Sequence, residues 1–298
     1  MSNKKILTIG LPVFNGEKFL RRRLENILSQ TFEDFLLVIS DNNSNDKTFD
    51  ICMEFQRLDK RITYVKQNFN QPIPNMHTLL NNSNTKYFVW AAIDDFWSTN
   101  FLENNIKILE DKPGIIGSIG AVYFFEDYDE FNINQFDTDS YNLIHVKTTS
   151  GTYENRVSKY MNFNQTSALY SVFRTGILKS SVVQKLNFLK KTLDPIAAWD
   201  TALIFRVLKH GDLHVNNNSS FFKYTKGITG VSNYDSVDYI LNVRKKSIVE
   251  AFILYLPFTL VSLKTMGIRI FLKNIKWFLL LNFRTGRRVF KNLFRLEH

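Results

Sequence analysis

Acidic and amide side chains follow three of the apolar runs in the first hundred residues, each at the point where the run ends. Asn15 and Glu17 follow the first of these runs, Asp41 the second, and Asp94 and Asp95 the third. Carboxylates that converge on one place repel one another unless a cation or hydrogen-bond donors join them. Oxygen ligands favour Mg²⁺ or Mn²⁺, which bind through one or two carboxylates and substrate phosphates. The pattern therefore predicts a divalent-metal site.

The elements that must position these side chains alternate between strand and helix patterns. Near-continuous apolar runs predict buried strands over Ile6–Val13, Phe35–Ile39, Arg61–Val65, Tyr87–Ile93 and Ile115–Phe125, and a further strand is expected over Leu169–Phe173. Apolar residues at helical spacing predict helices over Glu17–Gln30 and Pro74–Asn82, around Ile51, Phe55 and Leu58, and around Leu102, Ile106 and Leu109. This alternation predicts an α/β fold with a mostly parallel, Rossmann-like sheet flanked by helices. Ligands of such sheets bind at the carboxyl ends of the strands, so the polar side chains are expected on one rim.

The same carboxylates can also be read as purely structural. Asp41 and Asp46 are residues that a turn and a helix cap require, and Asp94 with Asp95 is a suitable cap for a following helix. Their joint placement at the ends of successive strands weakens this alternative.

The composition and the motifs exclude several classes of protein. A chain of 298 residues that is 44% apolar and 22% charged is neither disordered, collagenous nor a coiled coil. The single cysteine, Cys52, cannot form an intramolecular disulfide, and no Cys/His cluster offers a zinc site. No G-x-G-x-x-G follows the first strand, which disfavours a dinucleotide-dependent oxidoreductase. We expect neither a signal peptide nor a transmembrane helix, since the longest uncharged run, Ala251–Leu263, is too short.

Three strings stand in order and in register in the first half of the chain. They are Leu11–Glu17 (LPVFNGE), Ile27–Thr31 (ILSQT) and Ile39–Thr48 (ISDNNSNDKT). Together they resemble the start of a family 2 glycosyltransferase with the GT-A fold. Asp94 and Asp95 stand where that family has its metal-binding Asp-x-Asp motif, although Ala92 occupies a position where an aspartate is common. The resemblance covers Ile6–Leu109 and extends more loosely to Asn218.

This resemblance implies a nucleotide-sugar donor, and the family's functional residues carry over position by position. Asp41 would accept a hydrogen bond from the base, typically uracil, and Asp94 would contact the donor. Asp94 and Asp95 would hold Mg²⁺ or Mn²⁺, and the departure at Ala92 bears on metal affinity more than on donor binding. The other residues expected to bind the donor are Pro12, Phe14, Asn15, Glu17 and Asn43.

A later motif, Ala198–Leu203 (AWDTAL), lies in a predicted helix over Pro195–His210. It resembles the acidic motif whose aspartate is the catalytic base of the same family, with a Trp where a Glu is common. The resemblance implies that Asp200 takes the proton of an acceptor hydroxyl, and that the anomeric configuration is inverted. The alternative is that Asp200 pairs with Arg206 or Lys209.

Positive charge is concentrated near the carboxyl end. Of the formal net charge of +10, most lies after residue 237, where twelve Lys and Arg face three acids. Arg269, Lys273 and Lys276 share one helical face beside a broad apolar one, a pattern typical of a helix in a membrane interface. We expect a glycosyltransferase domain over residues 1–234 and a basic helical extension over 235–298 that binds the membrane surface. Packing on the domain or on a second subunit is the alternative, and nucleic acid is not expected.

The predicted function is the inverting transfer of a sugar from a nucleotide-diphosphate donor, expected to be a UDP-sugar, to a hydroxyl acceptor. The acceptor is expected to be a glycan or a lipid-linked saccharide in surface polysaccharide or glycolipid synthesis. The protein is then expected at the cytoplasmic face of the membrane. The alternative is a catalytically decayed nucleotide-sugar-binding or scaffold protein, which the missing acid at Ala92 permits.

Overall fold

The computed structural model describes residues 5–133, 142–144, 147–162, 166–182, 186–188, 191–193, 198–226 and 255–283. The chain divides into two units, the first made of residues 1–180 with 210–227 and the second of residues 181–209 with 228–298. The predicted boundary between residues 234 and 235 lies outside the described residues. The two units are therefore described separately.

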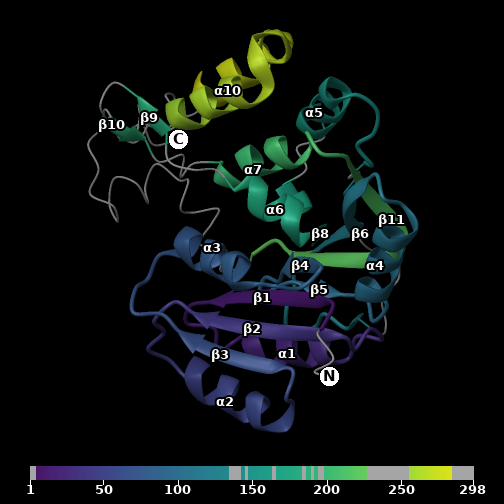
Figure 1. Cartoon of the computed structure of the whole chain (residues 1–298). Helices are drawn as coiled ribbons and strands as arrows, with labels where there is room; N and C mark the ends of the chain where they lie inside the picture. The colour runs from purple at the N-terminus through teal and green to yellow at the C-terminus, as the bar shows by residue number, and fades with distance from the viewer. Residues whose placement is uncertain are drawn as a thin grey trace. The chain divides into compact units, whose positions relative to one another are not determined.

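The apolar runs near the amino end of the chain form neighbouring parallel strands (Figure 1). β1 (Leu7–Val13) lies between β2 (Phe35–Asp41) and β4 (Tyr87–Trp90), and β3 (Ile62–Lys66) pairs with the outer side of β2. Every residue of β1 except Pro12 is buried, as expected for a strand with packing on both faces. The strands predicted in this region are confirmed.

The rest of the sheet contains strands of both directions. Its order is β3-β2-β1-β4-β8-β6-β11-β5, and β7 also pairs with β6. β6 and β11 run in the same direction as the first four strands, while β5, β7 and β8 run in the opposite direction. The predicted α/β fold with a mostly parallel sheet is confirmed. The added strands are β5 (Phe96–Trp97), β6 (Ile115–Phe125), β7 (Asn142–Ile144), β8 (Val172–Arg174) and β11 (Asp212–Tyr224).

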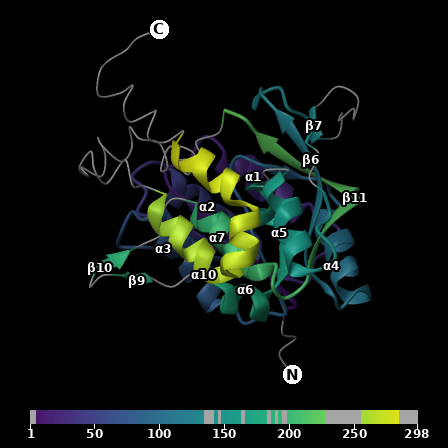
Figure 2. The same ribbon diagram turned by 90° about the horizontal axis from the view of Figure 1, so that it is seen from above.

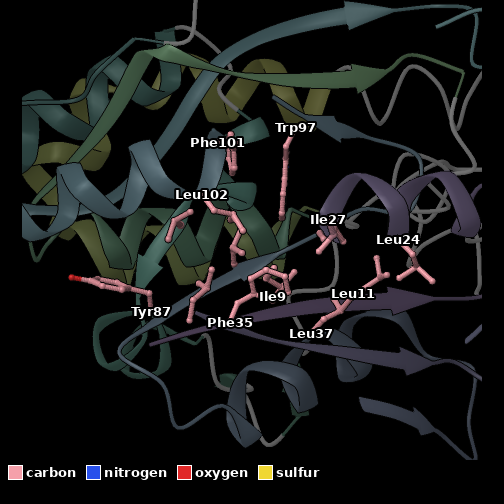
Figure 3. Close-up of a cluster of buried hydrophobic side chains, with 14 of the residues drawn as sticks. Ile9, Leu11, Leu24, Ile27, Phe35, Leu37, Tyr87, Trp97, Phe101 and Leu102 are labelled. Atoms are coloured by element: carbon pink, nitrogen blue, oxygen red, sulfur yellow. The ribbon is translucent and has the colours of Figure 1, made fainter. Parts of the chain in front are cut away.

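Helices cover both faces of the parallel part of the sheet. On one face, a single apolar core joins the strands to α1 (Leu20–Leu28), α2 (Thr48–Leu58) and α4 (Phe101–Asp111). Figure 3 shows Leu24 and Ile27 of α1 beside Ile9 and Leu11 of β1 in this core. α3 (Pro72–Asn82) packs on the other face, against β1 and β2. The remaining helices of this part are α5 (Tyr153–Asn162), the 3-10 turn η3 (Thr166–Tyr170) and α6 (Thr175–Ser181).

The described part of the second unit contains helices in contact and a short hairpin. α7 (Trp199–Val207) packs on α10 (Leu256–Lys273), where the rings of Phe205 and Phe258 stack with 6.1 Å between their centroids. Gly267 interrupts α10 with a φ of 78°, which glycine adopts without strain. The chain then turns at Asn274 and continues as a helix over 275–283 (Figure 2). The hairpin consists of β9 (Leu186–Phe188) and β10 (Lys191–Leu193).

Of the helices that the structure describes, none combines the length and the apolar character that a bilayer crossing requires.

Two predicted elements differ from those observed. The strand expected over Leu169–Phe173 begins as the turn η3, and only Val172 and Phe173 belong to β8. The helix expected over Pro195–His210 is observed as α7, which begins at Trp199 because the preceding Ala198 has a left-handed φ of 54°. The expected residues 195–197 lie outside the described part.

Candidate active site

The loops that follow β1 and β2 are joined by hydrogen bonds at the carboxyl edge of the sheet. The Asn15 side-chain oxygen accepts from the backbone N of Asn45 at 3.1 Å, and the Glu17 carboxylate accepts from the backbone N of Lys47 at 3.0 Å. Asn15 and Asn43 have φ angles of 48° and 67°, which asparagine tolerates better than most residues. The predicted donor-binding residues of these loops are therefore fixed in place before any ligand binds.

Asp46 has the turn and capping role that its residue type favours. Its Oδ1 accepts from the backbone N of Thr48 at 3.0 Å in the first turn of α2, and its Oδ2 accepts from the backbone N of Glu17 at 3.0 Å. The Thr48 hydroxyl accepts from the backbone N of Gly16 at 2.8 Å. Asp46 thus stabilises the junction of the two loops.

Asp41 is completely buried at the end of β2. Its Oδ1 accepts from the backbone N of Ser44 at 2.8 Å, and its Oδ2 accepts from the Tyr64 hydroxyl at 2.6 Å. Burial and this second bond raise the pKa of Tyr64 well above its usual value, so the phenol remains a donor to Asp41 at neutral pH. Each carboxylate oxygen accepts more than one hydrogen bond, so Asp41 retains capacity for a ligand.

Aromatic rings with exposed surface lie beside Asp41. Phe14 follows Val13, the β1 partner of Asp41, and is 38% exposed. Phe49 is also exposed and contacts the edge of Tyr64, with 5.5 Å between the ring centroids. Exposed rings next to a hydrogen-bond acceptor offer stacking surface and edge recognition for a planar base.

β1 separates Asp41 from the Asp94–Asp95 pair along the edge of the sheet. Val13 of β1 pairs with Asp41 of β2, and Gly10 of β1 pairs with Trp90 of β4. Both groups of carboxylates therefore come from strands that end at the same edge of the sheet. Adjacent strands lie about 4.8 Å apart, so β2 and β4, which lie on either side of β1, are roughly 10 Å apart across the sheet. Within the described ranges, no group of three or more His, Cys, Asp or Glu side chains could hold a metal ion together. This spacing suits an extended ligand better than a single ion.

Asp94 and Asp95 are almost completely buried, at 2% and 1% exposure. Asp95 Oδ1 accepts from the backbone N of Tyr224 at 3.0 Å, whereas Oδ2 of each aspartate has no hydrogen-bond partner. The pair does not cap a helix, because β5 follows directly and α4 begins after Asn100. Buried carboxylate oxygens without donors are rare, and a bound divalent cation would satisfy them. The residues present therefore fit the cation that the resemblance implies.

Two positively charged side chains outside the recognised motifs interact electrostatically with this pair. Arg23 of α1 is completely buried, and Lys223 of β11 is partly buried; both favour the ionised form of Asp94 and Asp95. The sequence does hold a signal for Arg23, because it stands beside Leu24, within the apolar face of an amphipathic helix. No pattern in the sequence distinguishes Lys223, since its place depends on how β11 pairs.

Asp200 lies in the second unit, in the first turn of α7. Its Oδ1 accepts from the backbone N of Thr201 at 2.7 Å. Asp200 and Arg206 are only partly buried, while the other residues of α7 are buried. A partly exposed acid on an otherwise buried helix is accessible to a ligand, and its approach to Asp94 and Asp95 stays a prediction.

Comparison with known proteins decides the family. The model of Glycosyl transferase family 2 matches residues 8–179, more than half of the chain. The chain belongs to this family. The matched range of this family 2 protein contains Asn15, Asp41, Asp94 and Asp95, so the sheet edge described above is the part that it shares with other members. The resemblance of the sequence to this family is confirmed.

Relatives and solved structures show what this family 2 protein is similar to. Glycosyltransferase GlyA of Streptococcus pneumoniae is 30% identical over 121 residues, 41% of this chain and 17% of GlyA. A GalNAc(5)-diNAcBac-PP-undecaprenol beta-1,3-glucosyltransferase of Campylobacter jejuni is 31% identical over 91 residues, 30% of this chain and 29% of the relative. The chain thus covers only part of the length of these relatives. Residues 1–349 of S. aureus TarS have a similar fold, with a TM-score of 0.59 and 13% identity over 98% of this chain and 92% of that structure.

The buried carboxylate pair of this family 2 protein predicts a pH-dependent stability. Burial raises the pKa of Asp94, and burial together with the charge of Asp94 raises that of Asp95 to about 7. At a pH between 3.8, the pKa of Asp95 in the unfolded chain, and about 7, its pKa in the folded chain, the folded chain binds one more proton than the unfolded chain. The free energy of unfolding therefore falls as the pH rises through this range. In EDTA, we expect the Tm to fall by several degrees between pH 5 and pH 8 because of Asp95.

The variant Asp95→Asn isolates this effect in thermal unfolding scans across that pH range. Asn keeps an acceptor for the backbone N of Tyr224 but has no proton to lose. His214, whose pKa is lowered by burial, acts in the opposite direction in both proteins and cancels in the comparison. Equal pH dependence of Tm in the wild type and in Asp95→Asn would contradict the prediction.

Proposed function

We propose that this family 2 glycosyltransferase transfers a sugar, with inversion, from a UDP-sugar to a hydroxyl of a lipid-linked glycan. The observation that carries the proposal is the buried Asp94–Asp95 pair, whose unpartnered oxygens stand on the same sheet edge as Asp41. That arrangement, an acceptor for a base at one end and a carboxylate pair at the other, suits a nucleoside diphosphate.

The choice of a UDP-sugar is supported by proteins of similar fold. The S. aureus TarS fragment of residues 1–349 has been solved in complex with UDP-GlcNAc and with UDP. In this chain, Asp41 would accept the hydrogen bond of a uracil ring, and Phe14 would offer it stacking surface. Pro12, Asn15, Glu17 and Asn43 would shape the remainder of the donor site.

Asp94 and Asp95 would hold Mg²⁺ or Mn²⁺ together with oxygens of the donor diphosphate. When bound, the cation offsets the negative charge that grows on the departing UDP. Both carboxylates are buried, and Phe96, which follows Asp95 in the chain, belongs to a buried aromatic cluster, so little water competes for the site. Asp95 is held in orientation by the backbone N of Tyr224.

Asp200 would be the general base of the reaction. A hydroxyl is a weak nucleophile at neutral pH, and a carboxylate that takes its proton contributes about 10² to 10⁴ in rate. The acceptor oxygen bonds to the anomeric carbon as the bond from that carbon to the diphosphate oxygen breaks. The proton passes to Asp200, UDP leaves with the bonding electron pair, and attack from the opposite face inverts the configuration.

The lipid-linked acceptor is proposed from a relative. The Campylobacter jejuni relative is named for its action on a saccharide linked through PP to undecaprenol. A donor-binding protein without catalysis is the second candidate, because Ala92 removes one acid of the family's usual metal motif. Turnover separates these two functions, since only the enzyme releases UDP from a UDP-sugar in the presence of Mg²⁺ or Mn²⁺.

Calorimetric titration with UDP and GDP tests the donor assignment. We expect UDP to bind at least tenfold more tightly than GDP in the presence of Mn²⁺. Asp41→Asn should weaken UDP binding about tenfold, because one charge-assisted hydrogen bond is lost. Asn can still accept from the backbone N of Ser44, so the fold should be retained. Equal affinities for UDP and GDP, or full UDP affinity in Asp41→Asn, would contradict the assignment.

We also propose that the second unit binds the cytoplasmic face of a membrane containing anionic lipids. The exposed side of α10 and of the helix over 275–283 carries large apolar side chains together with exposed Lys264 and Lys276. The opposite side is packed, since the ring of Phe278 lies 4.6 Å from that of Phe271. No Asp or Glu occurs between residues 251 and 296, which favours an anionic partner. The exposed apolar residues of these helices are Leu256, Ile268, Leu272, Ile275, Leu279, Leu280 and Phe283.

Co-sedimentation with lipid vesicles measures this association. We expect binding to vesicles of phosphatidylcholine with phosphatidylglycerol, and weaker binding to phosphatidylcholine alone. The double variant Leu272→Asn, Leu279→Asn should reduce the partition coefficient at least about tenfold, since it removes two exposed apolar side chains. Leu58→Asn, at a 76% exposed position of α2, is the matched control and should bind like the wild type. Equal binding of the double variant would exclude this face as the contact.

A further inference from the structure

Arg23 is a buried cation whose contacts are mostly uncharged. Its guanidinium carbon lies 4.0 Å above the Trp97 ring, and its Nη1 donates to the Asn26 side-chain oxygen at 2.7 Å. Its Nε and Nη2 are buried and have no hydrogen-bond partner. A buried guanidinium is costly unless other charges compensate it, so a partner of opposite charge is expected nearby.

The Asp94–Asp95 pair provides that opposite charge. Burial lowers the pKa of Arg23 to about 10, and Asp95, Tyr128 and Asp94, in that order, act against this by favouring its protonated form. Oδ2 of each aspartate is also buried without a hydrogen-bond partner. Two buried carboxylates and one buried guanidinium thus act on one another through their charges, with polar atoms left unpaired on both sides.

Asn26 and Trp97 fix the position of this cation. The Asn26 side-chain oxygen also accepts from the backbone N of Trp97 at 3.0 Å, and its Nδ2 donates to the Trp97 carbonyl at 2.9 Å. Trp97 follows Asp94 and Asp95 closely in the chain and belongs to β5. The guanidinium is therefore tied to the same short segment that presents the two carboxylates.

We propose that Arg23 is a built-in counter-charge of the Asp94–Asp95 pair, which keeps the affinity of the pair for a divalent cation low until a diphosphate is present. A fixed positive charge repels a cation that approaches the carboxylates, and the repulsion is strong where burial excludes water. The negative charge of a bound diphosphate offsets the positive charge of Arg23 and so reduces this repulsion. The identity of this diphosphate rests on the proposed function, whereas the low affinity of the donor-free pair does not.

Titration of the donor-free protein with Mn²⁺ by calorimetry tests this role without measuring activity. Arg23→Met removes the charge and retains apolar contact with Trp97, so we expect its Kd for Mn²⁺ to be at least about tenfold lower than that of the wild type. Arg23→Lys keeps the charge and should remain close to the wild type. Arg21→Met is the matched control, because Arg21 lies on the same helix but is exposed and paired with Glu54. It should leave the Kd unchanged.

Each outcome of the titration either supports or overturns the counter-charge role of Arg23. An unchanged or higher Kd in folded Arg23→Met overturns the proposal, as does a similar decrease in Arg21→Met or an absence of Mn²⁺ binding in every protein. If Arg23→Met does not fold, Arg23→Gln takes its place, since it also removes the charge but keeps a donor for the Asn26 side chain, and an unchanged Kd there overturns the proposal. If UDP fails to bind but Arg23→Met still binds Mn²⁺ more tightly, only the proposed function fails.

Discussion

Replacing Asp200 by Asn is expected to lower kcat by about 10² to 10⁴ while leaving the Kd for UDP unchanged. The amide has nearly the shape of the carboxylate but cannot accept the proton of the acceptor hydroxyl. Its oxygen can still accept from the backbone N of Thr201, so the first turn of α7 should remain intact. Initial rates with a UDP-sugar and calorimetry with UDP provide the two measurements.

Asp59→Asn serves as the matched control for this variant. Asp59 is also partly buried, but it pairs with Arg61 just before β3, at the amino edge of the sheet. We expect its kcat to equal that of the wild type. A kcat close to the wild-type value in Asp200→Asn, with UDP still bound, would remove Asp200 from the reaction.

Asp94→Asn is expected to lower kcat/KM by about 10² or more, because a metal ion that stabilises the leaving diphosphate contributes several kcal/mol. The loss should appear in the Kd for Mn²⁺ as well as in the rate. Stability should not fall, since the substitution removes a buried carboxylate whose pKa is raised by burial. Kinetics over a range of Mn²⁺ concentrations, with thermal unfolding in parallel, provide the measurement.

Ala92→Asp provides a complementary variant to Asp94→Asn. It restores an acid at the position where the family commonly has one, and should lower the Kd for Mn²⁺. If Asp94→Asn retained both its kcat/KM and its response to Mn²⁺, the carboxylate pair would have no role in holding the metal. A loss of folded protein would instead indicate a purely structural role.

The parallel half of the fold follows from local pattern. Leu7–Val13 and Phe35–Ile39 are continuous apolar runs, and the helix between them carries apolar residues at helical spacing, so the sequence of each element indicates its type. The carboxyl-edge position of Asn15 and Asp41 follows from the same pattern, since parallel strands end on one side. These features depend on near neighbours in the sequence.

The antiparallel strands depend instead on partners far along the chain. Phe96 and Trp97 form β5 because they pair with Phe222 and Phe221, which lie far later in the sequence. β8 is only three residues long and is a strand because it lies between β4 and β6. No local spacing encodes such pairing, and the short apolar segments fit several structures equally well.

Only the part of the candidate site that depends on local sequence pattern could be predicted. The sequence places Asp94 and Asp95 after a strand, but their burial and their unpartnered oxygens arise from tertiary packing. The roles of Arg23 and Lys223 depend on side chains brought together from α1 and β11. The sequence marks Arg23 as a charged residue on an apolar helix face but not the groups that it faces, and no pattern marks Lys223. Both roles could therefore be identified only from the structure.

A crystal structure of the chain with Mn²⁺ and an intact UDP-sugar analogue would place donor, metal and base in a single measurement. We expect Mn²⁺ bound to the Asp94–Asp95 pair and to the diphosphate, the uracil ring at Asp41, and the Asp200 carboxylate facing the anomeric carbon from the side opposite the diphosphate. Asp200 turned away from the sugar, or the nucleotide bound elsewhere on the chain, would contradict the proposed transfer.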